Sequence, residues 1–180
     1  MAYNSVAATF PFPTGSVDAS ATVNGVVDNK NYSVPTPARV TFGLGTGALK
    51  INLISKLYQA SLVATTAVID LTALLDEWGT AINFARVKGI VIYNFATTPG
   101  FVLKVGAAGT NPWDGLAVTA ASDKFKVPPG YLNGPVVVPG FVMVGAPDAA
   151  GLVVGTPKNI QLDSGANTVP YGIQFFGADA

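Results

Sequence analysis

Residues that could catalyse a reaction are scarce in this chain of 180 residues. It contains no histidine and no cysteine. Histidine is the commonest general base and neutral metal ligand, and cysteine supplies thiol nucleophiles and the sulfur ligands of zinc and iron–sulfur sites. A Ser–His–Asp triad, a thiol nucleophile and a zinc ribbon are therefore all excluded.

Carboxylates are the remaining route to acid–base hydrolysis. The single glutamate, Glu77, directly follows Asp76, and adjacent residues do not share a helix face. The other aspartates are isolated along the sequence, and no segment alternates oxygen ligands as a calcium loop does. We expect the Asp76–Glu77 pair to lie in a solvated turn, and we predict no enzymatic activity, no bound metal and no cofactor.

A glycine-rich segment, residues 43–48 (GLGTGA), formally matches the dinucleotide-binding fingerprint. That fingerprint requires a following helix within a parallel βαβ unit. Residues 49–61 do not predict a confident helix, and the next acidic residue, Asp70, lies in a strand-like run. We interpret the segment as a flexible hinge.

Two tryptophans are candidates for binding rather than catalysis. Trp78 precedes Gly79, and Trp113 lies in the turn-rich sequence NPWDG of residues 111–115. Aromatic rings on the loops of a β-sandwich can stack on sugars, which keeps a carbohydrate-binding hypothesis open. The favoured interpretation is that each tryptophan plugs one end of a sandwich beneath a glycine turn.

The elements that would position these residues are short strands separated by glycine and proline turns. Such spacing, about 8 to 12 residues, is typical of an all-β antiparallel sandwich or barrel. In residues 84–93, alternation predicts Val87 and Val91 on one face and Ile90 and Ile92 on the other. Residues 50–61 fit either a strand or a helix, and residues 72–79 predict a helical turn ended by Gly79. Further strands are expected at residues 39–42, 65–71, 100–105, 124–127, 136–138, 141–144, 152–154, 160–162 and 168–176, the last with Pro170 at an edge or bulge.

The N-terminal part differs from the rest, so we divide the chain into an extended arm, residues 1–37, and a sandwich domain, residues 38–180. The arm is rich in small and polar residues with several prolines, and we expect one strand in it, near residues 21–27. Extended arms are ordered mainly by lying on another surface, although a floppy terminus is the alternative.

Charge is unusually sparse. Only 11% of residues are charged and the net charge is zero, whereas about 25% is typical of soluble domains. We interpret this as a surface partly covered by protein partners; outer faces rich in Thr, Asn and Ser are the alternative. The scattered lysines argue against a nucleic-acid partner and a membrane-surface role. Residues 1–10 lack the pattern of a secretory signal, and residues 61–75 fall short of a membrane span.

Several motifs occur in an order and spacing that resemble a group of small bacteriophage virion proteins of the capsid decoration, or cement, type. The resemblance covers about three quarters of the chain, from Leu44 onward, and the proline-rich run of residues 128–147 departs from it. The motifs are residues 45–48 (GTGA), 70–79 (DLTALLDEWG), 83–94 (NFARVKGIVIYN), 105–107 (VGA), 111–115 (NPWDG), 127–130 (VPPG) and 169–177 (VPYGIQFFG).

This resemblance implies a jelly-roll-like sandwich on the capsid exterior that self-associates, often as a homotrimer, and binds the major capsid protein to stabilise the shell. A tail or head-fibre component and a carbohydrate-binding sandwich that recognises a cell surface remain alternatives. We predict that large aromatic residues contact the partners, namely Phe10, Phe12, Tyr32, Trp78, Trp113 and Tyr131.

Overall fold

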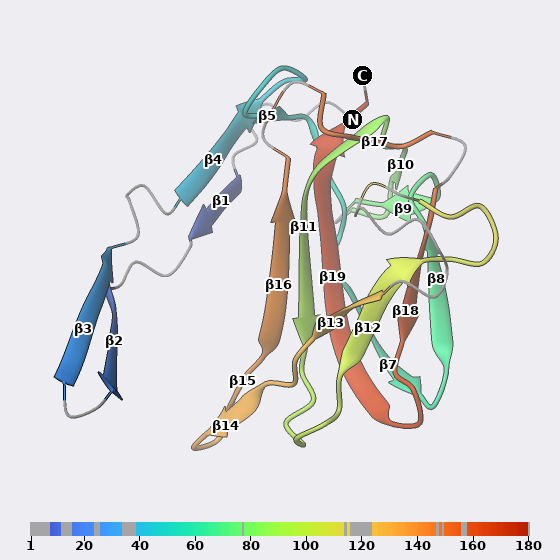
Figure 1. Ribbon diagram of the computed structural model, residues 1–180. Helices are drawn as coiled ribbons and strands as arrows, with labels where there is room; N and C mark the ends of the chain where they lie inside the picture. Colours follow the sequence, from blue (N-terminus) through green and yellow to red (C-terminus); the bar gives the residue numbers. More distant parts are fainter. Residues whose placement is uncertain are drawn as a thin grey trace.

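The computed structural model is an all-β sandwich, as the sequence predicts (Figure 1). It describes residues 8–11, 16–23, 26–33, 39–76, 78–113, 115, 124–146, 148, 150–155 and 158–179, and it describes side chains from Gly45 onward. No residue in these ranges is helical. The prediction of a helical turn at residues 72–79 is therefore wrong, and residues 50–61 form strands.

The larger sheet of the sandwich has six strands and is antiparallel. Its long central strands pair over most of their length, and short strands flank them. The order is β16 (Gly140–Gly145), β11 (Arg86–Asn94), β19 (Thr168–Ala178) and β6 (Leu53–Ile54), with β17 (Leu152–Val153) also on β11 and β7 (Tyr58–Val63) also on β19.

The second sheet has four antiparallel strands and lies against the first (Figure 1). Ile90, Ile92 and Phe175 of the larger sheet belong to one buried cluster with Leu103 and Leu162 of the smaller sheet. This cluster is the main core, and it fixes the two sheets face to face. The order of the smaller sheet is β13 (Lys124–Val127), β12 (Leu103–Ala107), β18 (Asn159–Asp163) and β8 (Thr66–Asp70).

A β-bulge in β11 changes which of its side chains face the core. The register with β19 shifts between Val87 and Gly89, so that Lys88 is the extra residue. Val87 consequently joins Ile90 and Ile92 in the main core, and Val91 lies in a second cluster on the other side of the sheet. The predicted grouping of Val87 with Val91 is wrong because simple alternation does not allow for the bulge.

The bulge residue, Lys88, ties the glycine-rich segment to the sandwich. Its fully buried ammonium group donates hydrogen bonds to the carbonyl oxygens of Thr46, at 2.6 Å, and Gly47. Burial, followed by the nearby positive charge of Arg86, lowers the pKa of Lys88. Residues 43–48 link β4 (Arg39–Leu44) to β5 (Lys50–Ile51), so they precede a strand and not a helix. This segment is held by specific bonds, unlike a free hinge.

Pro170 lies in a central strand, which corrects the expected edge position. It pairs with Ser61 of β7, and its carbonyl accepts a hydrogen bond from the Phe95 amide at 2.9 Å. Its nitrogen points to the same side, where β11 has already ended at Asn94. The missing N–H group therefore interrupts no ladder with β11.

The N-terminal strands stand apart from the two sheets in Figure 1. Two of them, β2 and β3, form a hairpin, although the sequence predicts a single strand near residues 21–27. β4 pairs with β1 and, in parallel, with β5. The bounds are β1 (Ala8–Pro11), β2 (Ser16–Val23) and β3 (Val26–Ser33).

Candidate interaction surface

Exposed apolar side chains are concentrated in one short stretch of the chain. The hairpin of β14 (Tyr131–Asn133) and β15 (Val136–Val138) exposes Tyr131, Leu132 and Val136 by 59–60% each, and Val137 by 41%. Phe141, at the start of β16, is 51% exposed. Soluble monomers rarely gather so many large apolar side chains in one place unless a partner covers them.

Both faces of this hairpin are apolar. The register pairs Leu132 with Val137, and Tyr131 with Val138, so these two pairs point to opposite faces. A hairpin of two three-residue strands is marginally stable in water by itself. Its apolar side chains therefore gain most when both faces are buried.

Two glycines fix the base of the hairpin. A Cβ atom at Gly140 would lie 1.9 Å from the Pro128 carbonyl oxygen, and one at Gly130 would lie 2.2 Å from the Val138 carbonyl oxygen. The two chain segments thus cross in backbone contact, which glycine permits. The Gly130 amide also donates to the Ala96 carbonyl at 2.8 Å, so the base is anchored to the end of β11. The hairpin leaves the sheet in a defined direction.

The hairpin continues into an edge strand without charge. In the described part of the chain β16 pairs with β11 alone, which leaves its other edge open. Residues 127–147 contain no Asp, Glu, Lys or Arg. Edge strands normally carry a charge or a proline that prevents pairing with other chains. Within β16 neither is present, so this edge is able to accept a partner.

The outer face of the larger sheet extends the apolar region away from the hairpin. Phe141 pairs with Tyr93 of β11, and the Tyr93 ring stacks on Phe95 with centroids 5.9 Å apart and an interplanar angle of 21°. Phe95 in turn lies over Gly172 of β19, where an added Cβ would be 3.1 Å from its ring. An aromatic strip therefore runs across three strands.

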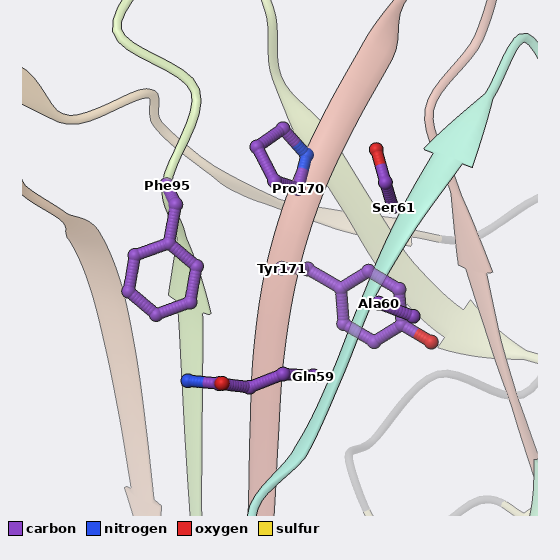
Figure 2. A pocket seen from close by; sticks show the side chains of 6 residues that line it. All are labelled: Gln59, Ala60, Ser61, Phe95, Pro170 and Tyr171. Carbon is purple, nitrogen blue, oxygen red and sulfur yellow. The ribbon is translucent and has the colours of Figure 1, made fainter.

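A shallow groove of about 440 Å³ lies at the end of this strip, between β19 and β7. In Figure 2, the Gln59 side chain reaches from β7 across β19 toward Phe95. The groove is lined by uncharged residues, namely Gln59, Ala60, Ser61, Phe95, Pro170 and Tyr171. The Tyr171 ring also belongs to the main core, and burial raises the pKa of its phenol. We call the hairpin, β16, the aromatic strip and the groove together the apolar face.

Of the six predicted contact residues, Tyr131 lies on the apolar face. Trp78 is 67% exposed, but it lies in the turn between β9 (Leu74–Leu75) and β10 (Ala81–Ile82). Phe10 and Tyr32 lie in β1 and β3, whose side chains are not described, and Phe12 lies outside the described residues.

Trp113 requires a correction, because the structure places it in the main core, 1% exposed. Its indole N–H donates to the Val153 carbonyl at 2.8 Å, and Gly115 packs so closely that an added Cβ would be 2.3 Å from the ring. A partner cannot contact this ring on the folded chain. Trp113 thus plugs the sandwich, as the favoured interpretation predicts, whereas the exposed Trp78 does not.

The turn at Trp78 also explains the fate of the candidate carboxylates. The Asp76 carboxylate accepts hydrogen bonds from the amides of Trp78, at 2.9 Å, and Thr80, at 2.8 Å. Asp76 is 4% exposed, so it supports a buried turn and not the solvated one expected; Glu77 lies outside the described residues. Within the described ranges no three His, Cys, Asp or Glu residues cluster as metal ligands would.

Comparisons with known proteins leave the surface as the main guide to function. Searches against family models, curated proteins and solved structures found no match. Among the described residues, no helix is long and apolar enough to cross a membrane.

Proposed function

We propose that this protein is a structural virion protein, a capsid cement or decoration protein that self-associates and binds the major capsid protein on the outside of a bacteriophage shell. The observation that carries the structural role is the apolar face, whose exposed side chains and open strand edge suit contact with other protein chains. The motif resemblance supports the capsid assignment and a jelly-roll-like arrangement of the strands. The proposal includes no catalytic step and no cofactor.

Cementing would work by burying apolar surface between neighbouring subunits. Each Å² of apolar area removed from water contributes about 25 cal/mol, and many copies at the symmetry axes of a shell would add up to a large resistance to internal pressure. Contacts with few charges suit this role because they leave no charge buried without a partner. The N-terminal arm is suited to adding a strand to a neighbour's sheet edge.

Quantitative mass spectrometry of purified particles, from a phage that encodes this chain, tests the proposal. A cement protein should be present in numbers comparable with the major capsid protein and should be missing from detached tails. A copy number of a few per particle would instead favour the tail or head-fibre alternative. Absence from particles would contradict a virion role.

Deleting residues 2–37 tests the arm separately. If the arm lies on a neighbouring subunit, the shortened chain should occupy fewer sites on capsids that lack the natural protein. Full occupancy by the shortened chain would exclude a role for the arm in attachment.

Carbohydrate binding remains the second candidate function, and the exposure of Trp78 is the observation that favours it. Stacking of a sugar on this ring predicts that Trp78→Ala abolishes binding to a glycan array and leaves the melting temperature unchanged. Equal glycan binding by the wild type and by Trp78→Ala would exclude this mode. Trp113 is excluded as the sugar platform because it is buried.

A further inference from the structure

We propose that the β14–β15 hairpin of one copy inserts into the groove between β19 and β7 of a second copy. This inference rests on the self-association included in the proposed function, but it does not depend on capsid binding. It names the two surfaces that meet and predicts a head-to-tail contact.

The hairpin has the properties of an inserting element. Leu132 and Val137 are exposed on one face, and Tyr131 on the other. A flat partner would cover one face and leave the second in water, whereas a groove with raised walls covers both. The backbone contact at Gly130 and Gly140 holds the hairpin in one direction, so little conformational entropy is lost when it binds.

The groove has the matching properties. It is open, it is large enough to hold several aliphatic side chains, and none of its six lining residues is charged. The whole stretch of residues 127–147, which includes the hairpin, is uncharged as well. Neither surface would therefore bury a charge without a partner when they meet, and a buried unpaired charge would be costly.

The groove of the same chain is out of the hairpin's reach. Gly140, Asn94, Tyr171 and Ala60 lie in one row across the larger sheet, because each pairs with the next. Strands are about 4.8 Å apart, so β11 and β19 separate the base of the hairpin from the groove. Figure 1 shows the hairpin projecting from the end of β16, away from β7.

This arrangement favours a second copy over an unrelated partner. Hairpin and groove open at the same end of the sheet, and the strip of Phe141, Tyr93 and Phe95 joins them in one continuous surface. Two different surfaces on one chain make a heterologous contact, which closes into a ring when the copies turn about an axis. With zero net charge, copies do not repel one another strongly.

Two exposed substitutions test the contact by sedimentation velocity on the full chain. Leu132→Asp places a charge on the hairpin, and Ser61→Arg obstructs the groove. Each variant should weaken association by about tenfold or more, as at the centre of an interface, and shift the mass toward the monomer value of 18.4 kDa. Val68→Asp and Thr66→Arg are matched controls on exposed positions of the smaller sheet, and should keep the wild-type mass.

Mixing the two variants gives the sharper result. The Leu132→Asp chain keeps its groove and the Ser61→Arg chain keeps its hairpin, so an equimolar mixture should form one intact contact and a species near twice 18.4 kDa. A mixture that stays monomeric, or single variants that keep the wild-type mass, would overturn the inference. If either variant melts early, Leu132→Asn and Ser61→Lys replace the pair.

The same variants separate this inference from the proposed function. Loss of self-association together with rescue in the mixture supports the hairpin contact even if the wild-type chain is absent from particles. A chain that occupies capsids and is monomeric in solution at every concentration would overturn the hairpin contact and leave the cement role standing.

Discussion

The outer faces of the two sheets differ sharply in charge. On the smaller sheet, Lys104 and Lys126 are paired across β12 and β13, and the Lys124 ammonium group lies 2.9 Å from the Asp163 carboxylate. On the larger sheet, the apolar face presents Phe141, Tyr93 and Phe95 and then an uncharged groove. One sandwich therefore carries one face typical of contact with water and one typical of contact with protein.

The comparison shows that exposure of a single apolar residue says little by itself. Val68 of the smaller sheet is 56% exposed, about as much as Phe141. Its cross-strand partner is the polar Gln161, whereas Phe141 adjoins an aromatic strip, an apolar hairpin and an open edge. Continuity of the apolar area distinguishes an interaction surface from an ordinary exposed side chain.

The comparison requires a rigid core beneath both faces, and replacement of Trp113 should weaken it most. Trp113→Ala removes a buried ring and its hydrogen bond to Val153, so we expect a loss of about 3 to 5 kcal/mol in the free energy of unfolding. Trp78→Ala, at an exposed position, should change it by about 0.5 kcal/mol or less. Urea denaturation measures both, and similar effects would contradict the placement of the two rings.

A methyl group at the base of the hairpin should have the next largest effect. Gly140→Ala places a Cβ atom 1.9 Å from the Pro128 oxygen, and relieving this overlap should cost about 1 to 3 kcal/mol and displace the hairpin. Gly145→Ala is the matched control on the same strand, because its Cβ would meet nothing within 4 Å. Thermal melting should separate the two variants, and equal melting temperatures would show that the base is not tightly crossed.

The charged face should respond to acid. The hydrogen bond from Lys124, together with one from the Gly165 amide, lowers the pKa of Asp163 below its usual 3.8. The native state therefore binds this proton less readily than the unfolded state, so the contribution is present above pH 3.8 and is lost as the pH falls through the lowered pKa. Because the pair is partly exposed, we expect about 1 kcal/mol or less.

Urea denaturation of the wild type and of Asp163→Asn, repeated at falling pH, measures this contribution. The stability difference between the two proteins should shrink as the solution becomes more acidic. A difference that stays constant at acid pH would contradict a stabilising Lys124–Asp163 pair.

Salt should have the smallest effect, and on self-association in particular. The apolar face contains no charge in residues 127–147 or in the groove lining, so screening has little to act on. We expect the association constant from sedimentation equilibrium to change by less than about threefold between low and moderate sodium chloride. A steep fall with salt would place the contact on the charged face instead.

The sequence predicts the strands well where turns bound them and poorly where a side chain redirects the backbone. Residues 124–127 and 136–138 coincide with β13 and β15. Residues 72–79 do not form a helical turn because the Asp76 carboxylate binds the amides of Trp78 and Thr80 and closes a hairpin loop. No local pattern announces that bond, just as none announces the bulge at Lys88.

The candidate surface was harder to predict than the fold. Tyr131 and Trp113 both look like contact residues in the sequence, yet one is exposed and the other fills the core. The uncharged run of residues 127–147 was the available signal, because a hairpin and an edge strand without charge need cover. The groove brings together residues 59–61, 95 and 170–171, which are far apart in the chain, so only the folded structure reveals it.

The mass of the purified protein in solution, measured by light scattering at several concentrations, tests most directly whether the apolar face is covered by protein. We predict a stable oligomer, with a trimer near three times 18.4 kDa as the expected species. A mass of 18.4 kDa at every concentration would contradict self-association through this face.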